Sequence, residues 1–313
     1  MWYNTGYAII RAWHREDYIR AMRYEGAIYR PPSEANSFIL QTTIGCSHNN
    51  CIFCCSYSAK KFRERELEEI FADIDEVSAR YRGLDRVFLA DGDAMAMDTG
   101  KLLTILGKLY ESFPVLERVS LYSTPRDLLR KSPDELERLR DAGLGIVYLG
   151  VETGNDELLR WIRKGVTRAE LAEAGVKARE AGLIVSVTVI NGLGGRENMI
   201  AHARDTASLI NDIDPHYLGL LTIMVVEGTP IYEMVQRKEY QVPSPMEIIS
   251  EIRLMVEGLD VSNCIFRANH ASNYLPLKAT LPGDKQKLLD ALDDMTGGGA
   301  SAVRLRPEYM RGL

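Results

Sequence analysis

The chain has 313 residues, of which 46% are hydrophobic and 26% charged, and its formal net charge is −6. These proportions are those of an ordinary globular protein and exclude the disordered and fibrous classes. The acidic balance and the lack of a long Lys/Arg cluster argue against a nucleic-acid backbone as the main partner, because neutralising phosphates needs a basic face.

No apolar run approaches the roughly 18 residues that a membrane span requires. The opening residues, MWYNTGYAIIRAWHRED, lack the basic and apolar regions of a secretory signal. We therefore expect a cytoplasmic protein without a membrane partner. The chain has five cysteines, four of them between residues 46 and 55, and in a reducing compartment this crowding predicts metal ligation and not a disulfide framework.

Apolar, β-branched runs alternate with amphipathic stretches along most of the chain. Each run reads as a strand and each stretch after it as a helix, several with recognisable caps such as the S-x-x-E box of Ser132 and Glu135. The predicted strands are residues 37–44, 86–91, 118–123, 145–152, 183–192 and 217–226.

Six consecutive βα units predict a parallel sheet that curls into a partial (β/α)6 TIM-like barrel, and an open doubly wound sheet is the competing topology. We expect an N-terminal extension over residues 1–36, the core barrel over 37–233, and a mainly helical C-terminal extension with a tail over 234–313. Either topology places ligands at the carboxyl ends of the strands.

The cysteines that follow the first strand are spaced C-x4-C-x2-C, through Cys46, Cys51 and Cys54. A structural zinc site needs four ligands, usually as two separated pairs, and recruiting His48 or Cys55 would be cramped. A thioredoxin-like redox pair is disfavoured by the third cysteine. Three thiols suit a [4Fe-4S] cluster that leaves one iron without a protein ligand.

This run, with Phe53 before the last cysteine, resembles the radical S-adenosylmethionine (SAM) enzymes, whose usual motif is C-x3-C-x-aromatic-C. The additional residue between Cys46 and Cys51 departs from that motif, and we interpret it as a subgroup marker. The resemblance is strongest to uncharacterised proteins similar to coproporphyrinogen oxidases. It implies a radical SAM barrel, a [4Fe-4S] cluster on Cys46, Cys51 and Cys54, and SAM bound at the open iron.

The resemblance also implies SAM contacts at successive strand ends. Asp91, Gly92 and Asp93 stand where the family has Gly-Gly-Glu, and which aspartate meets the SAM ammonium is open. The expected cofactor-binding residues are Phe53, Asp91, Gly92, Asp93, Ser123, Glu152 and Asn191. Taken singly, the aspartates could be helix caps and Glu152 part of a surface ion pair.

The polar segment RANHASNYLPL lies in the C-terminal extension. His270 and Asn273 are candidate catalytic residues at the barrel mouth, because His titrates near neutrality. Alternatively, these side chains satisfy the backbone of a closing loop. Arg304, Arg306 and Arg311 in the tail suggest a lid over an anionic substrate.

The sequence predicts a radical SAM enzyme that cleaves SAM reductively to a 5′-deoxyadenosyl radical and abstracts hydrogen from a small organic substrate. The electron would come from a reductant such as flavodoxin or ferredoxin. The alternative is a tetrapyrrole (haem) carrier that binds the cluster and SAM without abstracting hydrogen, and a zinc protein is the third hypothesis. The sequence gives no indication of oligomeric state.

Overall fold

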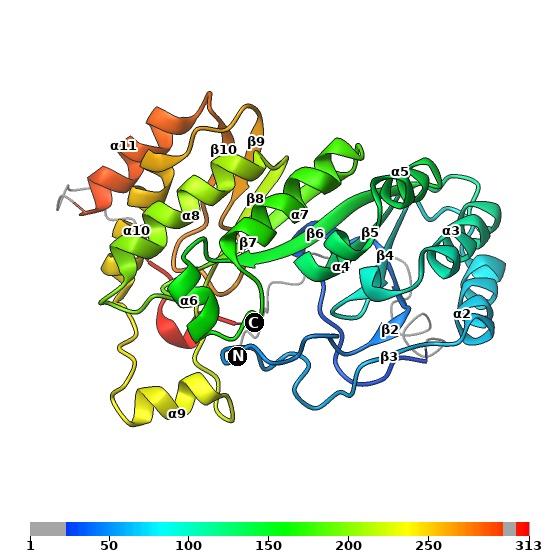
Figure 1. Ribbon diagram of the computed structural model, residues 1–313, viewed down its shortest axis with the longest axis horizontal. Helices are drawn as coiled ribbons and strands as arrows, with labels where there is room; N and C mark the ends of the chain where they lie inside the picture. The colour runs from blue at the N-terminus through cyan, green and yellow to red at the C-terminus, as the bar shows by residue number, and fades with distance from the viewer. Residues whose placement is uncertain (1–22, 297–304, 313) are drawn as a thin grey trace, which may run out of the picture. The chain divides into compact units, whose positions relative to one another are not determined.

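The computed structural model describes residues 23–296 and 305–312, which fall into two compact units (Figure 1). Unit 1 lies within Met1–Asn49, Ser56–Tyr148 and Glu180–Leu183, and unit 2 within Asn50–Cys55, Leu149–Arg179 and Ile184–Leu313. The predicted N-terminal extension is thus described only from residue 23 onward. None of the helices in the described part is long and apolar enough to cross a membrane.

Unit 1 is built on parallel strands that are almost completely buried. Its strands are β1 (Phe38–Gln41), β4 (Arg86–Ala90), β5 (Arg118–Ser123) and the first part of β6 (Leu144–Glu152), with a small antiparallel pair, β2 (Thr43–Ile44) and β3 (Arg63–Glu64). Its helices are η1 (Pro32–Glu34), α2 (Leu67–Arg80), η2 (Ala94–Ala96), α3 (Thr99–Ser112), α4 (Pro125–Arg130) and α5 (Pro133–Asp141). Helices α2 and α3 pack against each other.

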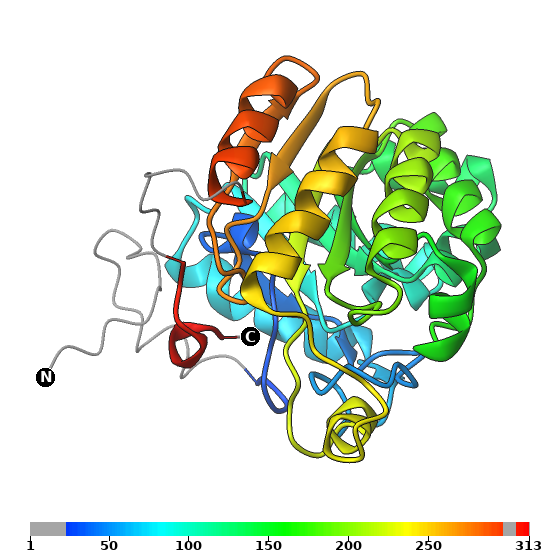
Figure 2. The same ribbon diagram turned by 90° about the vertical axis from the view of Figure 1, so that its left-hand side faces the viewer.

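Unit 2 continues from the last part of β6. Its strands are β7 (Ile184–Asn191), β8 (Tyr217–Thr222) and β9 (Cys264–Arg267), which are parallel, and β10 (Lys278–Leu281), which is antiparallel to β9. Its helices are α6 (Asp156–Trp161), α7 (Arg168–Glu180), α8 (Met199–Ile213), α9 (Pro230–Gln236), α10 (Pro245–Gly258), α11 (Lys285–Thr296) and η3 (Glu308–Met310). Helix α10 packs between α8 and α11, as Figure 2 shows.

The strand order confirms the barrel-type topology. The sheet runs β1-β4-β5-β6-β7-β8-β9-β10, so each core strand lies beside its successor in the chain, without the reversal of order that defines a doubly wound sheet. All six predicted strands are present, although the last ends at Thr222, four residues early. The C-terminal extension also adds β9 and β10. At four residues each, these strands are too short for their apolar alternation to outweigh the helical patterns beside them.

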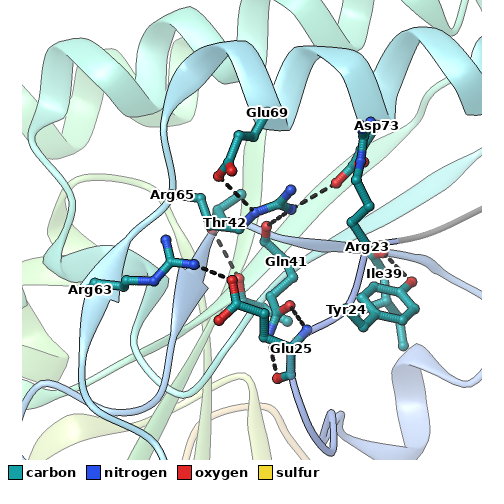
Figure 3. Close-up of polar contacts among 11 residues, drawn as sticks. Arg23, Tyr24, Glu25, Ile39, Gln41, Thr42, Arg63, Arg65, Glu69 and Asp73 are labelled. Carbon is teal, nitrogen blue, oxygen red and sulfur yellow. Dashed lines mark hydrogen bonds and ion pairs between the residues drawn. The ribbon is translucent and has the colours of Figure 1, made fainter.

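A polar network fixes the described start of the chain on unit 1 (Figure 3). The side-chain amide of Gln41 pairs with the backbone N–H and carbonyl of Glu25, at 2.9 and 3.3 Å. The guanidinium of Arg65 donates to the Gln41 carbonyl and to Asp73 Oδ2, at 2.8 and 2.7 Å. Arg65 and Asp73 are only 3% and 1% exposed. The network therefore joins β1, the β3–α2 connection and α2 through a buried ion pair.

Replacing Arg65 by Met should destabilise the protein by about 3–5 kcal/mol, because the buried Asp73 carboxylate loses its buried partner. Urea unfolding would measure this loss. The exposed Arg63, which pairs with Glu25, is the matched control. Arg63→Met should cost less than about 1 kcal/mol, and equal losses in the two variants would contradict the role assigned to the buried pair.

Candidate functional site

The Asp91-Gly92 segment after β4 holds the backbone that leads into Cys46. The Gly45 N–H donates to Asp91 Oδ2 at 3.1 Å. The Gly92 N–H donates to the Gly45 carbonyl at 3.1 Å. The backbone N–H and carbonyl of Gly45 are thereby both bound to the segment that follows β4. The position of Cys46 is consequently set by β4.

Asp93 holds the residue on the other side of Cys46. Its Oδ2 accepts a hydrogen bond from the Ser47 hydroxyl, and its Oδ1 accepts one from the Thr124 N–H at 3.3 Å. Asp93 is fully buried, and burial, with the negative charge of Asp127 next, raises its pKa well above the usual range. The predicted residues on strands β4 and β5 are therefore brought together, since Ser123 directly precedes Thr124.

The Asp91 carboxylate is neutralised by a lysine that sequence reasoning missed. Lys60 Nζ lies 2.5 Å from Asp91 Oδ2, and Gln41 Nε2 lies 3.3 Å from the same atom. Burial nevertheless raises the pKa of Asp91, against the opposing effect of Lys60. Its Oδ1 is buried and has no hydrogen-bond partner among the described residues. One carboxylate oxygen thus organises the cysteine loop while the other is unsatisfied.

Gly92 permits close packing next to these carboxylates. A Cβ added at this position would lie 2.5 Å from a ring carbon of Tyr57, which is 8% exposed. The ring of Tyr57 also meets that of Tyr29 edge to face, with centroids 5.8 Å apart. A side chain at Gly92 would have to displace this ring.

In unit 2, Cys51 and Cys54 lie on one turn, which the Cys54 N–H closes by donating to the Cys51 carbonyl at 3.2 Å. Between them, the Ile52 N–H donates to the Ile162 carbonyl at 3.1 Å, and the Ile52 carbonyl accepts from the Ile231 N–H at 3.2 Å. Ile52 is buried in an apolar cluster with residues from β7, α9 and their loops, and Phe53 packs against it. The turn is therefore anchored by both backbone and side-chain contacts.

The three predicted cluster ligands are partly buried. All five cysteines are described, and none forms a disulfide. Cysteine thiolates are the usual protein ligands of an iron–sulfur cluster, so the chemistry of these three donors fits such a cluster. Within residues 23–296 and 305–312, no three or more His, Cys, Asp and Glu side chains are grouped as a metal site. Cys46 belongs to unit 1 and the other two to unit 2, so their joint ligation stays a prediction.

Glu152 ends β6 in a strained conformation. Its φ of 64° is in the left-handed region, which non-glycine residues seldom adopt. The side chain is 11% exposed, and its Oε1 lies 2.7 Å from Lys164 Nζ. The ion pair considered from the sequence is thus present, but it is largely buried. Strain at a strand end is a feature of binding and catalytic sites.

Asn191 at the end of β7 is fully buried, and neither its side-chain oxygen nor its nitrogen has a hydrogen-bond partner among the described residues. Leaving a buried polar group unsatisfied costs about 1–3 kcal/mol. The backbone beside it is well satisfied, since the Asn191 carbonyl accepts from the Ile223 N–H at 2.9 Å. Its amide is a donor–acceptor pair of the kind that adenine edges match.

Two buried residues that sequence reasoning did not select lie next to Asn191. His202 on α8 is fully buried, with its Nε2 3.1 Å from the Ile190 carbonyl and its Nδ1 2.8 Å from the Thr153 hydroxyl. Glu251 on α10 accepts the Gly192 N–H on Oε1 at 2.8 Å. Burial lowers the pKa of His202 to about 4 and raises that of Glu251 to about 8. Both side chains are accordingly neutral at pH 7.

The candidate catalytic residues His270 and Asn273 lie in one loop of unit 2. Asn273 donates to the Leu220 carbonyl at 2.7 Å and accepts from the Thr222 hydroxyl at 2.8 Å, so its amide binds the end of β8. His270 Nδ1 accepts from the Ser272 N–H at 3.1 Å and lies 2.9 Å from the Ser272 hydroxyl. Burial, with the charge of Arg306 next, lowers the pKa of His270. A catalytic role for either residue stays a prediction.

Two tail arginines hold this same loop. Arg306 Nη1 donates to the carbonyls of Ala271 and Asn273, at 2.5 and 3.1 Å. Arg311 donates to the Ile223 carbonyl at 2.7 Å, and its guanidinium lies 4.2 Å from the centre of the Tyr274 ring. These guanidinium groups therefore fasten the tail to unit 2. The third arginine of the suggested lid, Arg304, lies outside the described residues.

Sequence reasoning missed the residues that support the predicted contacts. Lys60, His202 and Glu251 carry no motif, and each meets its partner only through the fold. The one available signal was composition, because His202 and Glu251 interrupt the apolar faces of otherwise ordinary amphipathic helices. A buried His–Glu pair cannot be matched across 49 residues of sequence without the sheet topology.

Residues 40–210 match the family model described as the radical SAM superfamily. The chain is 30% identical over 169 residues to a protein of Methanocaldococcus jannaschii named as a putative methylthiotransferase. The matched segment covers 50% of this chain and 35% of that protein. It is 22% identical over 173 residues to the heme chaperone HemW of Bacillus subtilis, covering 54% of this chain and 44% of the relative. Both matches thus span less than half of the relative.

Two solved structures share the fold. Coproporphyrinogen III oxidase (HemN) from Escherichia coli superposes with a TM-score of 0.52 at 17% identity, covering 71% of this chain and 51% of that one. Methylornithine synthase (PylB) gives a TM-score of 0.51 at 19% identity, with coverage of 72% and 63%. At these identities the likeness establishes the fold alone.

The raised pKa of Glu251 predicts how stability depends on pH. The folded chain keeps a proton on this carboxyl up to pH about 8, whereas the unfolded chain releases it near pH 4.5. Glu251 alone should therefore make unfolding easier as the pH rises from 4.5 to 8, whereas His202, whose pKa burial lowers to about 4, acts in the opposite direction below about pH 6.5. Glu251→Gln removes this contribution, so its free energy of unfolding, measured in urea across that range, should fall less steeply. Parallel curves for the two proteins would contradict the assignment.

Proposed function

The chain belongs to the radical SAM superfamily of enzymes, and we propose that it binds a [4Fe-4S] cluster through Cys46, Cys51 and Cys54 and cleaves SAM reductively. One electron from a reductant such as flavodoxin or ferredoxin breaks the C5′–S bond. The products are methionine and a 5′-deoxyadenosyl radical, which takes a hydrogen atom from a small organic substrate. The bound cluster would supply the redox chemistry.

The observation that supports this proposal best is the fixing of Cys46, because Asp91 and Asp93 bind the residues on either side of it. A cluster with three protein thiolates needs its ligands held before the metal arrives, because flexible thiols are free to bind metals in other geometries. Asp91 binds the backbone before Cys46 and Asp93 the hydroxyl after it. The two aspartates are then positioning residues for the cluster, whichever of them also meets the SAM ammonium.

The remaining strand ends supply candidate SAM contacts. Ser123 donates its hydroxyl to the Thr124 carbonyl at 2.8 Å, so it would offer its lone pairs to the ligand. Glu152 would bind a hydroxyl or ammonium group of SAM while retaining its ion pair with Lys164. Asn191 would contribute the turn along the adenosyl half. The polar loop of His270 and Asn273 is the proposed boundary of the substrate region.

The substrate class we propose is a small organic molecule and not a nucleic acid, on the basis of the net charge of −6. A relative named as a tRNA uridine(34) acetyltransferase of Methanocaldococcus jannaschii is 29% identical over 108 residues, covering 34% of this chain and 20% of that protein. A match over about a third of this chain and a fifth of that protein gives little support to tRNA binding.

The decisive assay is formation of 5′-deoxyadenosine by anaerobically reconstituted protein given SAM and dithionite, measured by mass spectrometry. Cys51→Ala should abolish the product, because the cluster loses one of its three thiolate ligands. Cys55→Ala is the matched control and should retain it, since we assign Cys55 as a packed thiol. Loss of product in Cys55→Ala with retention in Cys51→Ala would contradict the ligand assignment. Zinc with little iron and no sulfide in purified protein would favour the zinc hypothesis.

The second candidate function is a haem carrier, which the similarity to the heme chaperone HemW favours. A carrier should take up about one haem per chain and produce no 5′-deoxyadenosine above the Cys51→Ala background. An enzyme should produce 5′-deoxyadenosine without stoichiometric haem uptake. A spectrophotometric haem titration run beside the SAM assay distinguishes the two.

A further inference from the structure

One histidine ring in unit 2 binds the ends of two neighbouring strands. His202 Nε2 lies 3.1 Å from the carbonyl of Ile190, the residue before Asn191. Its Nδ1 lies 2.8 Å from the hydroxyl of Thr153, the residue after Glu152. The carbonyl can only accept, so Nε2 carries the proton and Nδ1 accepts from Thr153, whose hydroxyl lies nearer than that of Thr206 at 3.3 Å. The ring therefore binds the backbone before Asn191 and the side chain of the residue after Glu152.

Glu251 fixes the other side of Asn191. Its Oε1 accepts the Gly192 N–H at 2.8 Å and lies 3.4 Å from His202 Nε2. Its Oε2 is buried without a partner among the described residues. Gly192 has φ of 81°, and an added Cβ would lie 2.7 Å from the side chain of Ile248. Residue 192 is therefore restricted to glycine by both backbone and space.

A third group completes the turn. The Tyr240 hydroxyl donates to the Gly192 carbonyl, and the Tyr240 ring stacks on that of Trp161 with centroids 5.5 Å apart and planes at 23°. The Gly192 N–H is thus bound by Glu251 and the Gly192 carbonyl by Tyr240, and both side chains come from outside the turn. Rigid presentation of this kind lowers the ordering cost of binding a ligand.

We propose that Glu251 and His202 are positioning residues that hold the Asn191–Gly192 turn for the adenosyl half of SAM. The inference rests on the proposed function, because it assigns the turn to SAM. It goes beyond the predicted contacts by naming two residues that do not touch the ligand. Thr153 joins the network through His202, so the turns after β6 and β7 are held as one unit.

The first test compares two replacements of Glu251. Glu251→Gln keeps an acceptor for the Gly192 N–H, whereas Glu251→Met removes it at similar volume. In cluster-free protein, hydrogen exchange of residues 190–195, followed by mass spectrometry, should be faster in Glu251→Met and unchanged in Glu251→Gln. Faster exchange in neither variant would overturn the proposal without touching the proposed function.

The second test measures SAM affinity of the reconstituted proteins at equal iron and sulfide content. Glu251→Met should bind SAM about tenfold more weakly, the scale expected for one lost buried hydrogen bond. Glu251→Gln should stay within about twofold of wild type. Glu257→Gln, an exposed acid on the same helix, is the control and should bind as wild type does. Wild-type affinity in Glu251→Met would overturn the proposal, and no SAM binding by wild type would overturn the proposed function with it.

A double-mutant cycle tests whether the two turns act together. Thr153→Val removes the hydroxyl that donates to His202, and Thr153→Ser keeps it. If the network is one unit, the double variant with Glu251→Met should lose less SAM affinity than the product of the two single losses. Multiplicative losses would show that the turns are held independently, which contradicts the proposal.

Discussion

The predicted cluster loop depends on two aspartates whose carboxylates face away from water. Asp91 and Asp93 are fully buried, and each uses one oxygen to bind the chain on one side of Cys46. Burying a carboxylate is costly unless it is paired and hydrogen-bonded, and here Lys60 and the loop itself provide those partners. A short acidic motif at the end of β4 thus serves first as a structural support for Cys46, which follows β2.

In unit 2, buried side chains again hold the backbone at a strand end, but these side chains are neutral. His202 and Glu251 are buried without charge at pH 7. Both bind backbone at the end of β7, and His202 also binds the side chain of Thr153 after β6. Such networks are stable only when nearly every member is satisfied. The unsatisfied atoms lie at Asn191 and at one oxygen of Glu251, next to the turn that we assign to SAM. Local exceptions to hydrogen-bond satisfaction are expected where function requires them.

The periodic pattern of the sequence predicted the strands and their order, because six apolar runs followed by amphipathic helices have few parallel arrangements. The strands β9 and β10 were not predicted, because a run of four residues is too short to show a clear period of two. Motifs selected candidate site residues such as Cys46 and Asp91, and their roles stay predictions. The site was not predictable at His202 or Lys60, since ordinary helix and loop residues acquire their roles only from neighbours distant in sequence.

Binding of SAM to the open iron is tested most directly by electron paramagnetic resonance. The spectrum of the reduced, reconstituted protein would be recorded with and without SAM. Three thiolate ligands leave one iron open, so we expect a [4Fe-4S] signal that changes when SAM is added. Cys51→Ala should show neither the full signal nor the change. A complete cluster whose spectrum is indifferent to saturating SAM would contradict the account, because no iron would then be available to the ligand.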